Sequence, residues 1–196
     1  QALLAIAFAL DRGLMAVGAN LPNTGQGWYV QETTQPIVVD GTENDWTPMT
    51  NWAQHPWPGT TVQLANDPAW LYMRINVDDA THTRLDARDA AAVEADHVIL
   101  QPGRGSHQRS YLIASTASGA ILAHPLEARV RGLPDQISAQ WLELGSGYRI
   151  ELRIPRAQAP DQLGIGVFDA DAPTRFDGGK PDVRPLLSLS PALSND

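Results

Sequence analysis

The stretch Trp70-Leu-Tyr-Met-Arg-Ile-Asn-Val-Asp78 places an aliphatic or methionine side chain at every second position. The stretch Tyr148-Arg-Ile-Glu-Leu-Arg-Ile-Pro155 repeats this two-residue period, with Arg and Glu between its apolar residues. Successive side chains of a β-strand point to opposite faces, so each stretch has one apolar face and one polar face. An antiparallel sheet has this pattern when it covers a core on one side only. We therefore expect both stretches to be strands of such a sheet.

Shorter segments of the same kind lie on both sides of these two stretches, separated by turn residues. They are Trp28–Glu32, Pro36–Asp40, Thr61–Ala65, His97–Gln101, Arg109–Ser115, Ala120–Ala123, Gln140–Leu144, Leu163–Asp169 and, in the tail, Arg184–Leu193. Roughly ten short strands without alternating helices are typical of two packed sheets. The pattern predicts an all-β fold, an antiparallel and jelly-roll-like β-sandwich over residues 28–190, with one helical turn within Asp86–Ala95.

The first 20 residues have a different period from the rest of the chain. Apolar residues recur there at helical spacing and form one stripe, made of Leu3, Leu4, Ala7, Leu10 and Leu14. Residues 2–16, in the segment 1–20, are therefore expected to form an N-terminal α-helix, and turn residues such as Gly18 follow it. Two interpretations stay open: the helix packs on the sandwich, or it is a stalk that continues from a membrane segment upstream.

The composition excludes several classes of protein. The chain has 196 residues, with 22 acidic against 14 basic residues and a formal net charge of -8. Such a surface repels phosphate backbones, so we expect no nucleic-acid partner. Cysteine is absent, which excludes disulfides, thiolate zinc sites and cysteine nucleophiles. No stretch approaches the roughly 20 apolar residues that span a bilayer.

Motifs of catalysis are missing from the sequence. Nucleophile elbows, phosphate-binding loops, dinucleotide fingerprints and His-Glu-x-x-His pairs do not occur. The five histidines never stand at ligand spacing on one element. We therefore expect no catalytic residue and a chain that is not itself an enzyme, while an acid–base pair hidden in the loops stays an open alternative.

Acidic residues are closely spaced after the candidate strand that ends at Asp169. Asp169, Asp171 and Asp177 offer oxygen ligands at a spacing that suggests calcium, although the segment lacks the third ligand and the terminal Glu of an EF-hand loop. A solvated turn is the alternative explanation, and the same choice applies to the pair Asp78-Asp79.

Tryptophan is frequent, with six Trp against three Phe. In a sheet protein, Trp either fills the core or offers a flat apolar platform beside polar groups, which suits the C–H faces of sugar rings. Trp52 and Trp57 lie in a loop segment, where exposure is expected. Trp46, Trp70 and Trp141 are expected in the core, although Trp141 is kept with Trp52 and Trp57 as a candidate ligand contact.

Four segments occur in a characteristic order: Ile37-Val-Val-Asp-Gly-Thr-Glu-Asn-Asp-Trp46, Leu64-Ala-Asn-Asp-Pro-Ala-Trp-Leu-Tyr-Met-Arg-Ile-Asn-Val-Asp-Asp79, Gly147-Tyr-Arg-Ile-Glu-Leu-Arg-Ile-Pro155 and Gly164-Ile-Gly-Val-Phe-Asp-Ala-Asp171. Together they resemble the family 9 carbohydrate-binding modules, a β-sandwich family related to DOMON domains. The resemblance implies a sandwich that holds a sugar between two Trp side chains. It aligns Val93 with the first of these positions, and Phe176 is the aromatic residue nearest to the second, so Phe176 joins the ligand-binding candidates.

The flanks carry a second resemblance. The leading helical segment and the trailing Val183-Arg-Pro-Leu-Leu-Ser-Leu-Ser-Pro191 are similar to the extracytoplasmic sensor region of a proteobacterial membrane histidine kinase of the dedicated-sortase-system type. This resemblance implies a periplasmic domain of a homodimeric, membrane-anchored parent whose kinase core lies outside this chain. The leading hypothesis is therefore a sensor domain that binds a small molecule or glycan and signals to that kinase. The alternative is a carbohydrate-binding module of a polysaccharide-degrading enzyme.

Overall fold

The computed structural model describes residues 27–46, 53–103, 108–126, 137–159, 161–171 and 180–189. The helix expected in residues 1–20 lies outside these ranges, as do Trp52, Phe176 and Asp177. Within the described ranges, no helix has the length and apolar character needed to cross a bilayer.

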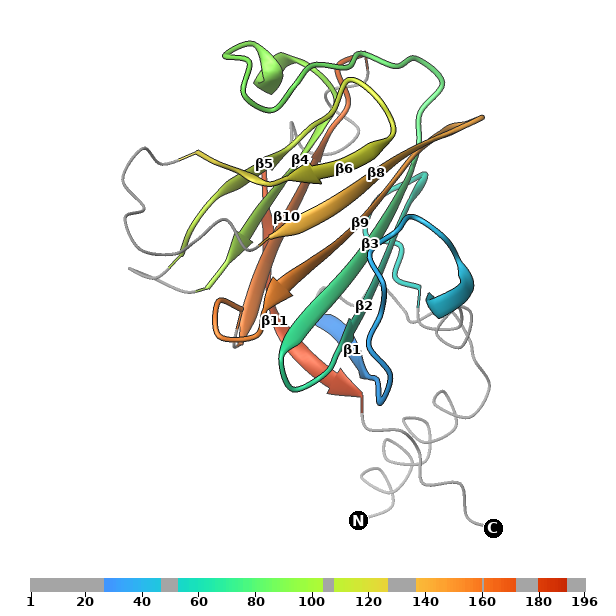
Figure 1. The fold of residues 1–196 in the computed structure, drawn as a ribbon. Helices are drawn as coiled ribbons and strands as arrows, with labels where there is room; N and C mark the ends of the chain where they lie inside the picture. Colours follow the sequence, from blue (N-terminus) through green and yellow to red (C-terminus); the bar gives the residue numbers. More distant parts are fainter. Residues whose placement is uncertain are drawn as a thin grey trace, which may run out of the picture.

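The described part of the chain is all-β, as the sequence predicts (Figure 1). Its strands are β1 (Trp28–Glu32), β2 (Thr60–Asn66), β3 (Trp70–Asp78), β4 (His97–Pro102), β5 (Tyr111–Ile113), β6 (Gly119–Leu122), β7 (His124–Pro125), β8 (Ser138–Leu144), β9 (Gly147–Pro155), β10 (Gln162–Phe168) and β11 (Asp182–Leu189). A 3₁₀ turn, η2 (Ala92–Glu94), forms within the segment where a helical turn is expected.

One continuous sheet folds over into two facing layers. The first layer has the strand order β6-β8-β9-β3-β2-β1, and the second has the order β10-β4-β5-β7. Strand β11 belongs to both layers, because Asp182–Pro185 pairs with β10 and Leu186–Leu189 pairs with β1. The result is a β-sandwich that turns a corner at β11, in agreement with the fold expected from the alternating stretches.

Two details differ from the expected antiparallel sandwich. Strand β1 runs parallel to both of its neighbours, β2 and β11. Pro36–Asp40, expected as a strand, does not pair with any strand and instead crosses the outer face of the first layer (Figure 1). Its backbone is held by side chains: the Val38 N–H donates to the Asp45 carboxylate at 2.9 Å. The local apolar run therefore reflects the burial of Ile37 against the first layer and not strand pairing.

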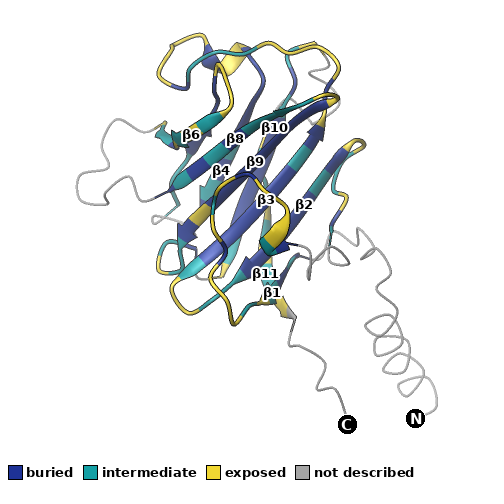
Figure 2. Cartoon of the chain, turned by 45° about the vertical axis from the view of Figure 1, so that its right-hand side comes forward, coloured by how far each residue is buried: buried dark blue, intermediate teal, exposed yellow. Residues whose placement is uncertain are grey.

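The main core lies between the two layers (Figure 2). Leu71, Met73, Ile75 and Val77 of β3 are all buried in it, and they register against the apolar face of β9, formed by Tyr148, Ile150, Leu152 and Ile154. Burial of side chains of this size stabilises a fold by about 2 kcal/mol each. The two-residue period of the two longest strands thus sets which face of the first layer points inward.

The turn between β8 and β9 gives a direct test of the packing of β3 on β9. A Cβ at Gly147, whose φ is 146°, would lie 1.9 Å from the Val77 carbonyl oxygen, whereas a Cβ at Gly119, whose φ is 151°, would meet nothing within 4 Å. We expect Gly147→Ala to cost about 3 kcal/mol and Gly119→Ala about 1 kcal/mol, because only the first adds a backbone clash to the strain of the positive φ. Urea unfolding of both variants measures this, and equal losses would contradict the close approach.

Candidate functional site

The segment from Pro36 to Trp46 covers part of the outer face of the first layer. Ile37 and Trp46 are buried there against Ala65 of β2 and Tyr72 of β3, in a small apolar cluster separate from the main core. Trp70, at the start of β3, packs against the edge of this cluster and is half-buried. Part of the outward face of β3 is therefore shielded from solvent, because this segment lies over it.

Charged side chains that emerge from β3 and β9 hold the same segment in place. The fully buried Glu151 carboxylate accepts the Gly41 N–H at 2.8 Å. Arg149 donates to the Gly41 carbonyl at 3.3 Å, and its other terminal nitrogen and Arg74 both reach the Glu43 carboxylate. Gly41 has a φ of 83°, a conformation that glycine adopts without strain. The segment is thus fixed by a charged cluster, formed by the buried Arg74, Arg149 and Glu151 together with the exposed Glu43.

The two carboxylates of this charged cluster have opposite pKa shifts. Hydrogen bonding and charge from Arg149, followed by Arg74, lower the pKa of Glu43 below its usual 4.5. Burial raises the pKa of Glu151 above 4.5, and its second oxygen has no hydrogen-bond partner among the described residues. The hydrogen bond from the Gly41 N–H is therefore compatible with a protonated, neutral Glu151. Glu43, in contrast, interacts with the two arginines as an anion.

A groove of about 640 Å³ lies beside the fixed segment, on the same outer face. One wall is the segment 36–39, and the opposite wall comes from Ala120–Leu122 of β6 and Ser138 of β8. Trp70 and Tyr72 line the groove between these walls. Val38 and Leu122 expose 58% and 61% of their surface, so the rim is apolar and open to solvent. This is a concave, mostly apolar surface of the size that small ligands occupy.

Polar groups stand at defined places in this groove. The Arg153 guanidinium lies 4.5 Å from the centre of the Trp70 ring, and its Nε donates to the Ser138 hydroxyl at 3.2 Å. The Asp67 carboxylate accepts the Tyr72 hydroxyl at 2.7 Å and the N–H groups of Ala69 and Trp70. Burial opposes ionisation of Asp67, but these three hydrogen bonds outweigh it and lower its pKa.

A second hollow of about 870 Å³ adjoins the first and shares three lining residues with it, Pro36, Asp67 and Ala69. Its other lining residues are mostly polar: Glu32, Thr33, Thr34, Asn66, Pro68 and Arg156. The two hollows therefore form one extended groove, called the outer groove below. Its part at the Trp70 end is called the apolar hollow, and its part at the Glu32 end, where most lining residues have polar side chains, is called the polar hollow.

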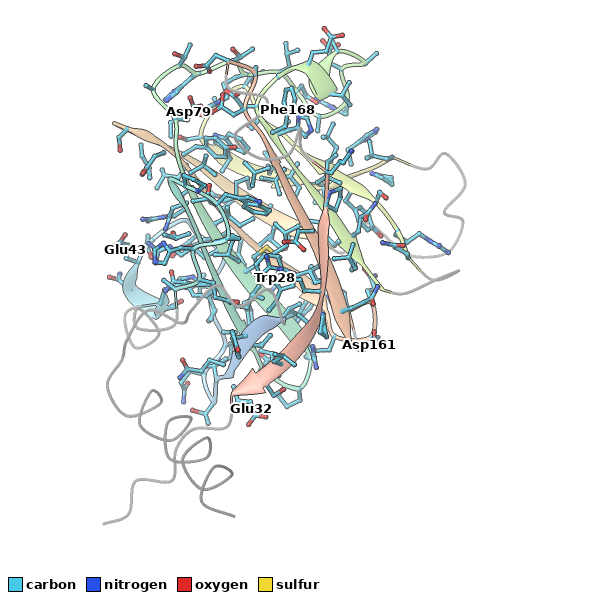
Figure 3. The ribbon with its side chains drawn as sticks, turned by 180° about the vertical axis from the view of Figure 1, so that it is seen from behind. Trp28, Glu32, Glu43, Asp79, Asp161 and Phe168 are labelled. Atoms are coloured by element: carbon cyan, nitrogen blue, oxygen red, sulfur yellow. The ribbon has the colours of Figure 1, made fainter. Side chains whose placement is uncertain are left out.

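Acidic residues meet at one end of the sandwich. Asp79 and Phe168 both lie at this end, and Glu32 lies at the other (Figure 3). One carboxylate oxygen from each of Asp79, Asp169 and Asp171 lies within 4.8 Å of the other two. Asp79 and Asp169 are each 3% exposed, and Asp171 is exposed. The cluster joins the end of β3 to the segment after β10, and it is called the acidic cluster below.

A network of charged and aromatic side chains lies beneath the acidic cluster. Arg84 pairs with Asp79, Asp96 and Glu143, and its guanidinium lies 4.7 Å from the centre of the Tyr148 ring. The Tyr148 hydroxyl is buried without a hydrogen-bond partner among the described residues. Burial raises its pKa well above 10, and the charges of Asp96, Asp79 and Asp169 add to this. The buried Tyr148 hydroxyl is thus close to the acidic cluster and makes no hydrogen bond with the described residues.

The site residues predicted from the sequence lie in different parts of the structure, and some of them are buried in the core. Trp141 is fully buried, with its ring stacked 4.4 Å from Tyr148, so it offers no surface to a ligand and belongs to the core. Trp57 is half-buried and packs 6.4 Å from Trp28 against the core, outside the lining of the outer groove. The carboxylates of Asp169 and Asp171 lie close to each other, and Asp79 is the third carboxylate beside them. Val93 is 49% exposed on η2.

Sequence reasoning assigned Trp70 to the core and did not single out Arg153 as a ligand contact. A signal was present, because Trp70 stands on the face of its strand opposite to Leu71, Met73, Ile75 and Val77. A Trp on the outward face of a strand is a better candidate for ligand contact than one on the inward face.

Comparison with known proteins bears on the fold. No protein-family model matches the chain, and no curated protein matches it. Among solved structures, a family 9 carbohydrate-binding module from Caldicellulosiruptor kristjanssonii in complex with cellotriose is similar, with a TM-score of 0.58, 16% identity and coverage of 86% of this chain and 96% of that one. The same kind of module in complex with glucose has a TM-score of 0.57, 15% identity, and coverage of 86% and 99%. Identity at this level shows a shared fold and no more.

The opposite pKa shifts in the charged cluster predict opposite pH effects. Folded Glu151 binds its proton more tightly than the unfolded residue, so its contribution is present below about pH 4.5 and is lost as the pH rises through the raised pKa. Folded Glu43 binds its proton less tightly, so its contribution is present above about pH 4.5 and is lost as the pH falls through the lowered pKa. Relative to the unmodified chain, Glu151→Gln should therefore gain stability with rising pH, whereas Glu43→Gln should lose it. Urea unfolding between about pH 4 and 8 measures both differences, and differences of the same sign would contradict the assignment.

Proposed function

We propose that this chain is a carbohydrate-binding module that holds a glycan in the outer groove. Two observations support the proposal: the fold is shared with modules whose structures are in complex with cellotriose and with glucose, and the outer groove offers an aromatic, open surface. The groove carries the proposal, because identity of 16% transfers no binding residue from the similar structures.

The chemistry of the outer groove suits sugar rings. A pyranose ring has apolar C–H faces and a rim of hydroxyl groups, so it binds where an aromatic side chain lies beside hydrogen-bonding groups. Trp70 and the apolar walls supply the first, and Arg153, Ser138 and the polar hollow supply the second. The two adjoining hollows give room for more than one ring of a linear chain.

The sensor hypothesis rests on the sequence resemblance of the flanks, and it is compatible with glycan binding. A sensor domain would bind its ligand in such a groove and pass the change to a kinase core. Membrane anchoring, dimerisation of the parent and a periplasmic location stay predictions. No catalytic role is proposed for this chain, and the similar structures are themselves binding modules.

We further propose that the acidic cluster holds a calcium ion. Calcium takes oxygen ligands, and carboxylates from Asp79, Asp169 and Asp171 converge from two segments that are distant in sequence. The unpartnered Tyr148 hydroxyl beside them fits a site completed by bound water. In this role the ion would join the end of β3 to the segment after β10.

Blocking the outer groove tests the proposed function. We expect wild type to bind cellotriose and Leu122→Arg to bind it at least tenfold more weakly, because a long charged side chain then lies over the Trp70 hollow. Leu122 is 61% exposed, so the change should leave folding intact. Isothermal titration calorimetry measures the affinities, with a thermal melt of each variant beside it.

Val93→Arg is the matched control, because Val93 is also exposed but lies on η2, at the other end of the sandwich from the β2–β3 turn (Figure 1). This variant should bind like wild type. Loss of binding in Val93→Arg together with full binding in Leu122→Arg would move the site to that end. No binding of cellotriose, or of any member of a glycan panel, by wild type would contradict the proposed function.

Calcium addition tests the acidic cluster. At a concentration roughly 100 times Kd, we expect calcium to raise the Tm by about 5 °C, because the ion binds only the folded chain. Asp171→Asn, which changes an exposed ligand, should remove most of this rise, whereas Asp78→Asn, which removes a neighbouring charge outside the cluster, should keep it. Equal responses of the two variants in differential scanning calorimetry would contradict the calcium site.

A further inference from the structure

The arginines of the described residues differ in whether they meet a carboxylate. Those with an ion pair include Arg74, Arg84, Arg88, Arg149 and Arg184. Arg153 and Arg156 have no ion pair within the described ranges. In a chain with 22 acidic against 14 basic residues, an arginine without an acidic neighbour is unexpected, because carboxylates are abundant.

Both of these arginines line the outer groove. Arg153 is exposed and borders the apolar hollow, and Arg156 is half-buried and borders the polar hollow. Arg153 uses Nε on the Ser138 hydroxyl, and Arg156 uses Nη1 on the Ala159 carbonyl at 3.1 Å. The remaining guanidinium N–H groups make no hydrogen bond with the described residues, so each arginine keeps donors for a ligand.

The acidic residues of the outer groove do not occupy these donors. Asp67 already accepts three hydrogen bonds, from Tyr72 and the backbone of Ala69 and Trp70, and it makes no ion pair with either arginine. Glu32 is exposed at the polar end and has no ion pair in the described part of the chain. The groove therefore presents cationic donors beside Trp70 that neither Asp67 nor Glu32 pairs with in the described part of the chain.

We infer that the outer groove binds a glycan whose rings carry carboxylate groups, that is, a uronic-acid polysaccharide; this rests on the proposed function. One uronate ring packs in the Trp70 hollow and pairs its carboxylate with Arg153. Arg156, in the adjoining hollow, meets a second carboxylate of the same chain. A guanidinium presents parallel N–H donors that match a carboxylate, and such charge-assisted hydrogen bonds are about twice as strong as neutral ones.

A matched pair of trisaccharides tests this inference. β-1,4-linked triglucuronate and cellotriose share ring and linkage, and they differ in a carboxylate or a hydroxymethyl group on each ring. We expect wild type to bind triglucuronate at least tenfold more tightly than cellotriose at low salt, with a preference that shrinks at high salt. Isothermal titration calorimetry measures both affinities.

Three variants assign the preference to residues. Arg153→Gln and Arg156→Gln should each weaken binding of triglucuronate more than binding of cellotriose, so that the ratio of the two affinities falls several-fold. Arg88→Gln is the matched control, because Arg88 is exposed, is paired with Asp86 and does not line the outer groove. It should keep the full preference.

The outcomes separate the inference from the proposed function. Equal binding of both trisaccharides, or tighter binding of cellotriose, would overturn the inference and leave the proposed function standing. A preference that survives in the Arg153→Gln, Arg156→Gln double variant would also overturn it. If free glucuronate or sulfate binds as tightly as triglucuronate, the groove is an anion site and the inference fails. If wild type binds no glycan at all, the proposed function fails with it.

Discussion

The hydrogen bond from the Gly41 N–H to the buried Glu151 carboxylate is the contact on which the outer groove depends. Together with Arg74 and Arg149 it fixes the segment 36–46 across the first layer, and that segment supplies one wall of the groove. Burying a carboxyl group is costly unless it is hydrogen-bonded, which explains why Gly41 turns its backbone toward β9 at this point. Loss of this contact would remove a buried anchor of the segment that forms this wall.

The sequence was a good guide wherever one face of a strand meets the main core. The two-residue period of β3 and β9 predicted their inward faces, because burial on one side imposes this pattern on each strand separately. It was a poor guide where partners lie far apart in the chain. The parallel pairing of β1, and the crossing path of Pro36–Asp40, depend on which segment lies alongside, and no local pattern records that.

The same limit applies to the sites. The spacing of Asp169 and Asp171 pointed to an acidic cluster, but Asp79 joins it only because β3 and β10 end at the same end of the sandwich. Trp141 was kept as a ligand contact on residue type alone, and its burial against Tyr148 comes from its inward register on β8. The unpaired state of Arg153 and Arg156 is a property of the folded surface, so no sequence pattern reveals it.

We propose that ligands bind to the outer face of the first layer and not to the loops at the end of the sandwich. Nuclear magnetic resonance of the isotopically labelled chain, titrated with an oligosaccharide that binds to it, tests this location most directly. We expect the largest chemical-shift changes at the Trp70 indole N–H and at the amides of Val38, Leu122 and Ser138, all of which line the groove. Changes concentrated instead at Val93 and around Asp169, with the Trp70 signal unmoved, would contradict it.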